Sequence, residues 1–110
     1  GQKATTCPEG RSASNGYPLK VCEMLSTQTG TYYAERVSTH NAKNVLLAKK
    51  AIKKAIQNQA ENKGFSIVEV ITNCPTNWKM TPVDSLKYIE QQVLTVYPLG
   101  VYKDGDKTNA

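Results

Sequence analysis

The order of hydrophobic and polar residues predicts two strands and a short leading helix. Pro18 opens a helix over about 18–28 with one apolar side, and Gly30 is placed to stop it. The β-branched and aromatic stretch 31–38 (TYYAERVS) predicts a strand. The stretch 65–72 (FSIVEVIT) is nearly continuous in apolar residues, which predicts a second strand that is covered on both faces.

A long amphipathic helix over 43–63 separates the two strands. Thr39 or Asn41 can cap its start, and Gly64 is placed to end it at the C′ position. Apolar residues at spacings of three, four and seven predict its buried face: Val45, Ala48, Ile52, Ala55 and Ile56. A strand, a long helix and a strand in this order predict a right-handed parallel crossover.

A last helix begins at the sequence TPVDS. Thr81 is the expected N-cap, Pro82 the first helical residue and Asp84 a partner for the amides of the first turn. The apolar stripe of this helix is predicted to be Leu86, Ile89 and Val93. Residues 97–102 (YPLGVY) indicate an apolar exit segment, and 103–110 (KDGDKTNA) a frayed tail.

These elements predict an α/β fold class, with a parallel β-α-β unit and flanking helices in one domain over 1–110. Within it, 1–17 is a loop, 18–98 holds helix, strand, helix, strand and helix, and 99–110 is a tail. Two parallel strands are too few to form a stable sheet alone. We therefore expect a domain fragment, the trailing part of a larger α/β domain, which can self-associate in isolation.

Composition narrows the class of protein. With 110 residues, 39% hydrophobic and 21% charged, the chain has the make-up of one small soluble domain. No apolar run approaches the roughly 20 residues of a membrane span, so no membrane partner is expected. Three cysteines without a CxxC pair (Cys7, Cys22 and Cys74) favour a cytoplasmic location over a disulfide framework. Together with His40 their spacings match no zinc-finger pattern, so a self-contained metal site is not indicated.

The net charge of +5 suggests an acidic partner. The long helix carries a cluster of lysines: Lys43, Lys49, Lys50, Lys53, Lys54 and Lys63. A binding module for nucleic acid or an acidic protein is the alternative function that this cluster supports. A solvated helix face is the simpler interpretation, because no arginine or aromatic residue of the helix provides base contacts. We therefore expect no nucleic acid partner.

Three polar segments are weaker candidates. The loop 5–11 (TTCPEGR) can cradle a carboxylate or phosphate through Thr5, Thr6 and Arg11, or can be a plain surface turn. His40 lies at a strand-to-helix junction with no partner named by the sequence, so it is interpreted as a helix-start residue. The segment 103–109 (KDGDKTN) resembles the beginning of a calcium loop, but a disordered polar tail is preferred since no element frames it.

Cys74 follows the second strand in the stretch VITNCPTNWKM. One interpretation is a small buried hydrophobic residue, since free cysteines are often buried. The other is a thiolate ligand on a loop at the carboxyl end of a strand, where binding sites of open α/β sheets gather.

The chain as a whole resembles a known family. The segment GFSIVEVITNCPTNWKMTPVDSLKYIE (64–90), followed by YPLGVYKD (97–104), resembles the thiamine-diphosphate-binding β subunit of the 2-oxoacid:ferredoxin oxidoreductases. TTCPEGR, GYPLKVCEML and YYAERVSTHN occur in the order found in that family. The resemblance covers nearly the whole chain, and the branches for 2-oxoglutarate and branched-chain 2-oxoacids are the most similar.

The resemblance implies an enzyme. Its members decarboxylate a 2-oxoacid oxidatively with thiamine diphosphate and Mg²⁺, transfer the acyl group to coenzyme A, and pass electrons through a [4Fe-4S] cluster to ferredoxin. The implied partners are the α subunit and the γ and δ subunits of the same complex. A cysteine at the position of Cys74 is similar to the fourth cluster ligand, and Thr5 and Thr6 are placed near the active site. No catalytic residue is assigned.

The chain departs from the family pattern in one respect. The GDG-type motif for thiamine and magnesium lies upstream in the family, and Gly1 and Gln2 resemble the end of the TGGQ segment that follows it. The DGD at 104–106 is not a substitute for this motif. We therefore expect the C-terminal part of the subunit, in a thiamine-diphosphate-binding fold, with no cofactor bound by this chain alone and no activity of its own.

Overall fold

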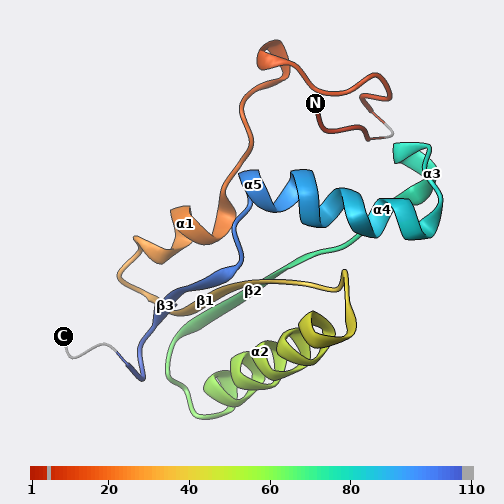
Figure 1. Ribbon diagram of the computed structural model, residues 1–110. Coiled ribbons are helices and arrows are strands. Elements are labelled where there is room, and N and C mark those ends of the chain that lie inside the picture. Colours follow the sequence, from red (N-terminus) through yellow and green to blue (C-terminus); the bar gives the residue numbers. More distant parts are fainter. Residues whose placement is uncertain (5, 108–110) are drawn as a thin grey trace.

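The computed structural model describes residues 1–4 and 6–107 and has a mixed three-stranded sheet between two layers of helices (Figure 1). The strands are β1 (Thr31–Ser38), β2 (Phe65–Ile71) and β3 (Gly100–Asp104), in the spatial order β2-β1-β3. β1 runs parallel to β2 and antiparallel to β3. The predicted α/β class and its parallel β-α-β unit are therefore confirmed.

Helices lie on both faces of this sheet. They are α1 (Val21–Ser26), α2 (Ala42–Ala60), α3 (Pro75–Trp78), α4 (Pro82–Tyr88) and α5 (Leu94–Val96), with a 3-10 turn η1 (Ala13–Asn15) and a π-helical turn η2 (Ile89–Val93). In Figure 1, α2 lies under one face, and α1, α4 and α5 lie over the other. In the described part of the chain, no helix combines the length and the hydropathy needed to cross a bilayer.

Helices α2 and α4 begin at the caps that the sequence predicts. The Asn41 side chain accepts a hydrogen bond from the Asn44 N–H at 2.9 Å, and the Thr81 hydroxyl accepts one from the Asp84 N–H at 3.1 Å. Thr39 does not take the cap of α2, because Asn41 does.

The end of α2 is earlier than predicted. The helix stops at Ala60, and Asn62, with φ 54°, occupies the C′ position two residues before Gly64, whose φ of 126° is also positive. The Lys63 N–H then donates to the Asn58 carbonyl at 3.0 Å, which closes the helix as in a Schellman motif. Asparagine tolerates this conformation better than most residues, so glycine is not needed at C′.

The buried face of α2 was predicted wrongly in part. Ala48 and Ala51 are buried against the sheet, whereas Val45, Ile52 and Ile56 are 38%, 44% and 65% exposed. The small alanines allow the helix to lie close to β1, and this contact turns the larger side chains toward the flank. α2 therefore carries an apolar stripe that no other described element covers.

The second strand is covered less than predicted. Phe65 and Val70 of β2 are 51% and 38% exposed. Val68 packs against the small core of Val37, Ala48 and Ala51. β2 lies at the edge of the sheet, so its side chains have neighbouring strand residues on one side only and remain partly accessible.

The C-terminal segment is a strand and an ordered turn, not the predicted exit segment and tail. β3 pairs with β1, and the turn after it holds Asp104 and Asp106 against α2. The Lys54 Nζ lies 2.6 Å from an Asp104 carboxylate oxygen, and the Lys63 Nζ lies 3.1 Å from one of Asp106. The Tyr32 hydroxyl donates to the same Asp106. Only residues 103–107 of the predicted tail can be compared, because 108–110 lie outside the described residues.

Candidate functional site

Cys74 lies on a loop just past the carboxyl end of β2. The strand ends at Ile71, and Cys74 occupies the N-cap position of α3, where its side chain is half-buried. The Asn77 amide donates to its Sγ at 3.4 Å. The predicted loop position is confirmed, and the thiol is neither fully buried nor fully exposed.

Polar and aromatic contacts fix the loop that carries this thiol. The Asn73 amide donates to the Ser85 hydroxyl at 2.8 Å, and this hydroxyl donates to the Pro82 carbonyl at 2.7 Å. The Trp78 and Tyr88 rings meet edge to face with centroids 5.0 Å apart. The loop from β2 to α4 is therefore attached at both ends to the helix that follows it.

A cavity of about 600 Å³ lies beside this loop. Its aromatic wall comes from Trp78, Tyr88 and Tyr97, and its polar groups include Glu69 and Arg11. The rest of its lining comes from the segment before α1, the end of β2, and the η2 and α5 turns. The site therefore gathers segments from the two ends of the sequence and from its middle, although Cys74 itself is not among the described residues that line it.

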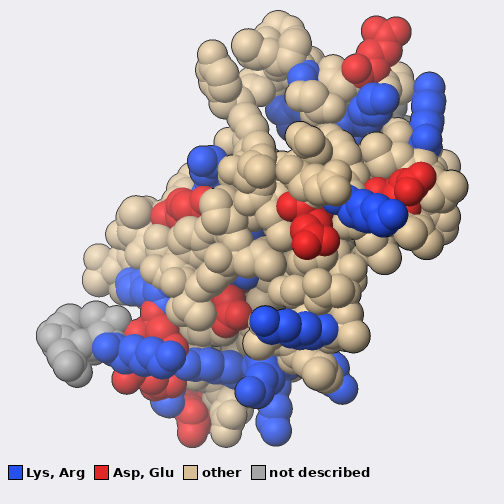
Figure 2. Space-filling view, viewed as in Figure 1, with Lys and Arg blue, Asp and Glu red and all other residues tan. Residues whose placement is uncertain are grey.

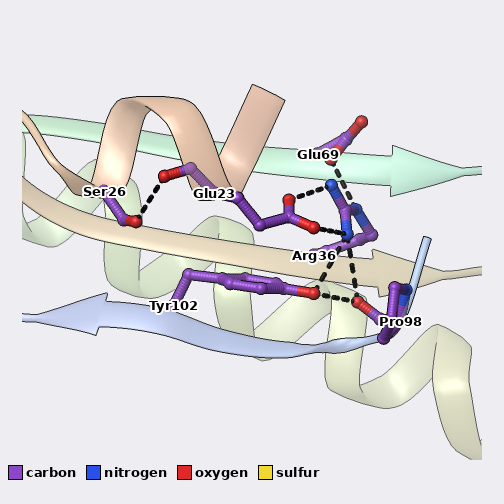
Figure 3. A network of polar contacts seen from close by, with 6 residues as sticks. All are labelled: Glu23, Ser26, Arg36, Glu69, Pro98 and Tyr102. Atoms are coloured by element: carbon purple, nitrogen blue, oxygen red, sulfur yellow. Dashed lines mark hydrogen bonds and ion pairs between the residues drawn. The ribbon is translucent and has the colours of Figure 1, made fainter. Parts of the chain in front are cut away.

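Arg36 is the centre of the most extensive polar network, and the sequence analysis did not identify it. Its side chain is fully buried on the sheet face that α1 covers (Figure 3). The Arg36 Nε lies 2.6 Å from a Glu69 oxygen, and its Nη2 lies 2.6 Å from a Glu23 oxygen (Figure 3). Its Nη1 also donates to the Tyr102 hydroxyl at 3.0 Å and to the Pro98 carbonyl at 3.2 Å.

This network joins four elements at one guanidinium. Glu23 comes from α1, Glu69 from β2, Tyr102 from β3 and Pro98 from the segment between α5 and β3. The Arg36 guanidinium holds the pKa of Glu23 below its usual range, chiefly through their hydrogen bond. Because Glu69 also lines the cavity, the network fixes one side of the candidate site.

Cys22 lies close to this network, in surroundings that favour the protonated form of its thiol. It is fully buried in α1, and burial raises its pKa from 9.0 to about 11, with the negative charge of Glu69 adding to the effect. A thiol must lose its proton to bind a metal. Cys22 is therefore a packing residue, unlike the half-exposed Cys74.

The predicted anion cradle can be compared with the structure only in part. Thr5 lies outside the described residues, and Thr6 is exposed in a turn. The Arg11 guanidinium donates to the Asn15 carbonyl at 2.5 Å and lines the cavity, which Thr6 does not. The structure therefore brings Arg11, but not Thr6, to the candidate site.

His40 has hydrogen-bond partners that the sequence did not name. Its Nδ1 lies 2.7 Å from the Ser38 hydroxyl, and the Asn41 amide lies 3.2 Å from its Nε2. Ser38 is fully buried and His40 is 8% exposed. This serine is closed to a substrate, so His40 is a hydrogen-bonded core residue at the start of α2.

Curated proteins similar to the chain are subunits of oxidoreductases and synthases of 2-oxoacids. The ketoisovalerate oxidoreductase subunit VorA of Methanothermobacter marburgensis is 33% identical over 105 residues, which cover 94% of this chain and 22% of that protein. The 2-oxoglutarate synthase subunits KorB of Archaeoglobus fulgidus and Methanocaldococcus jannaschii are each 32% identical, over 83% of this chain and 33% and 32% of those proteins. The chain is homologous to subunits of the 2-oxoacid:ferredoxin oxidoreductases.

The homology to 2-oxoacid:ferredoxin oxidoreductase subunits supports the resemblance read from CPTNW and YPLG. The chain spans about a fifth to a third of the length of these relatives. No family profile matches it, and no solved structure is significantly similar to it.

Among the described residues, the side chains that could bind a metal are not gathered into a complete site. A [4Fe-4S] cluster takes four ligands, and the described residues contain no group of three or more His, Cys, Asp or Glu side chains placed to hold a metal. Asp104 and Asp106 of the DGD segment bind Lys54 and Lys63 instead of facing an open site. Cys74 could therefore be a metal ligand only together with residues of other segments or chains.

Proposed function

We propose that this chain is the C-terminal part of the thiamine-diphosphate-binding β subunit of a 2-oxoacid:ferredoxin oxidoreductase. The observation that carries the proposal is the homology, over 94% and 83% of the chain, to subunits of ketoisovalerate oxidoreductase and 2-oxoglutarate synthase. The incompletely covered sheet and the exposed apolar stripe of α2 are consistent with a domain that packs on further parts of a larger protein. We place this protein in the cytoplasm, since its cysteines are unpaired thiols.

In the intact enzyme, the proposed reaction is the oxidative decarboxylation of 2-oxoglutarate or a branched-chain 2-oxoacid to an acyl-CoA, with ferredoxin as electron acceptor. Thiamine diphosphate with Mg²⁺ would supply the carbanion chemistry, and residues outside this chain would hold this cofactor. The chain's own contribution is positional: the loop after β2 holds the Cys74 thiol next to a cavity with an aromatic wall.

We further propose that Cys74 provides one thiolate to the [4Fe-4S] cluster, with the other ligands in other segments. Two observations support this assignment. Cys74 lies on a fixed loop at the carboxyl end of a parallel strand, and its side chain is partly exposed. The Asn77 amide near Sγ is suited to donate to a thiolate, which would tune the cluster's potential.

Electron paramagnetic resonance of the reduced, purified complex tests this assignment. Cys74→Ser is expected to remove the [4Fe-4S] signal or convert it to another form. Cys7→Ser changes a second half-buried cysteine and is the matched control, with an unchanged signal. An unaltered spectrum in the Cys74 variant would defeat the ligand assignment.

The substrate branch is tested in the same complex. Rates of ferredoxin reduction with coenzyme A are compared for 2-oxoglutarate and for the branched-chain 2-oxoisovalerate. We expect at least one to support turnover, and the ratio of their kcat/KM values assigns the branch. If neither 2-oxoacid supports turnover in an intact complex that is loaded with cofactors, the proposed activity is wrong.

A further inference from the structure

The lysines of α2 and of the turn that follows it fall into two groups with different surroundings. Lys54 and Lys63, toward the C-terminal end, are bound by Asp104 and Asp106 of the chain's own turn. The second group lies toward the N-terminal half and is exposed: Lys43, Lys49, Lys50 and Lys53. Within residues 1–4 and 6–107, no carboxylate is in ion-pair range of this second group. In Figure 2, blue side chains gather along the lower part of the molecule, over α2.

Two exposed leucines lie among the lysines of this second group. Leu46 is 61% and Leu47 is 44% exposed. On a helix, residues three or four apart are neighbours, so Lys43 and Lys50 each adjoin both leucines, and Lys49 adjoins Leu46. Together these side chains and Lys53 line a shallow hollow of about 630 Å³. We call this surface the Lys–Leu hollow.

The chemistry of the Lys–Leu hollow favours an acidic protein segment over other occupants. Two leucines offer an apolar floor that a phosphate backbone cannot use, and α2 has no arginine or aromatic residue for base contacts. A second copy of the chain seated symmetrically would bring lysines against lysines. The C-terminal segment is an example at the end of the same helix and in the turn after it, since its carboxylates bind Lys54 and Lys63, each beside a tyrosine ring.

We propose that the Lys–Leu hollow docks an acidic segment of another protein chain, with an apolar side chain of that segment inserted between Leu46 and Leu47 and its carboxylates on the surrounding lysines. This interaction surface is independent of the proposed 2-oxoacid chemistry. It uses the face of α2 that is turned away from the sheet, whereas the cavity beside Cys74 lies on the other side of the sheet.

The test uses the protein purified in its native assembly. A carbodiimide that couples carboxylates to amines without a spacer is applied first, and mass spectrometry locates the coupled lysines. Coupling of Lys49 or Lys50 to a carboxylate of a companion chain supports the proposal. If the hollow is unoccupied, the probe is a synthetic peptide of glutamates with leucines at i and i+4, compared with the same peptide carrying serines.

The leucine peptide is expected to bind about tenfold tighter than the serine peptide, because it buries leucine side chains. Leu46→Ser/Leu47→Ser should remove this difference, and Lys49→Ala/Lys50→Ala should weaken binding about fivefold at low salt. The matched control Lys3→Ala/Lys87→Ala changes two exposed lysines of other elements and should have no effect. Circular dichroism verifies that each variant is folded.

Four results would overturn the proposal. The first is the absence of both cross-links and peptide binding. The second is equal affinity for the leucine and serine peptides. The third is tighter binding of duplex DNA or of phosphatidylserine vesicles than of the leucine peptide. The fourth is sedimentation showing that the leucine pair mediates self-association.

Discussion

At the scale of single residues, Arg36 is the side chain with the most consequences for stability. An arginine in a strand is usually turned to solvent, and the sequence alone gives no reason to place this one inside. Its burial depends on two carboxylates, Glu23 from α1 and Glu69 from the paired strand. Such long-range pairing cannot be read from local pattern, although Glu69 is the direct cross-strand partner of Arg36 in the parallel register.

Replacing Arg36 by methionine is expected to destabilise the fold. Methionine fills the space but leaves both carboxylates without their cation, and breaking such a pair lowers the free energy of unfolding by about 3 kcal/mol. Arg36→Lys keeps the charge but not the forked geometry, so a smaller loss of about 1–2 kcal/mol is expected. Urea denaturation followed by circular dichroism measures both. A methionine variant as stable as the parent protein would contradict this account.

The cysteines are expected to differ in reactivity. Burial raises the pKa of Cys22 to about 11, so at pH 8 its reactive thiolate is scarce, and its side chain is inaccessible. Iodoacetamide should therefore modify Cys22 at least about tenfold more slowly than Cys7 or Cys74, which are half-exposed.

Peptide mass spectrometry over a time course gives the three rates. In denaturant the three rates should become similar, which is the internal control. Modification of Cys22 first in the folded protein would show that α1 does not enclose it.

At the scale of helices and strands, short sequence patterns predict the structure best. The strand 31–38 and the caps Asn41 and Thr81 follow from short patterns, and the structure has them where predicted. The buried face of α2 was less predictable, because large apolar side chains dominate a periodicity pattern while the alanines Ala48 and Ala51 make the contact. The distance between helix and sheet, which is a tertiary property, determines whether the alanine stripe or the stripe of larger apolar residues on α2 is buried.

The cap of α4 allows a quantitative check. Thr81→Ala removes the oxygen that accepts from the Asp84 N–H, and a loss of about 1 kcal/mol in the free energy of unfolding is expected. Thr81→Ser retains a hydroxyl at the same place and should lose much less. Chemical denaturation of the two variants gives the comparison, and equal stabilities would mean that the cap does not contribute.

At the scale of the whole molecule, β3 is the strand that the sequence pattern did not predict. It has only five residues, between a proline-containing segment and a charged turn, and it pairs with β1 some 65 residues earlier in the chain. A strand this short has little local signal, and the pairing that stabilises it is visible only in three dimensions. The position of Cys74 was predictable from the strand before it, whereas the cavity, built from distant segments, was not.

The turn after β3 packs closely against the Tyr32 ring, and one added methyl group can test this contact. A Cβ on Gly105 would overlap the Tyr32 ring, whose hydroxyl is held by Asp106. Gly105→Ala should therefore displace the turn and lower the free energy of unfolding by about 1–2 kcal/mol. Gly30→Ala adds the same group in open space and should be neutral or slightly stabilising. Thermal denaturation compares the two, and equal melting temperatures would refute the contact.

The order β2-β1-β3 leaves β1 as the strand with backbone partners on both sides. β2 and β3 are therefore edge strands, and within the described residues their outer amides and carbonyls have no strand beside them. Such rims act as templates for another strand. Growth of the sheet in a larger assembly would have to start at one of these two rims. In a concentrated solution of the isolated polypeptide, the same rims would favour fibre-like polymerisation.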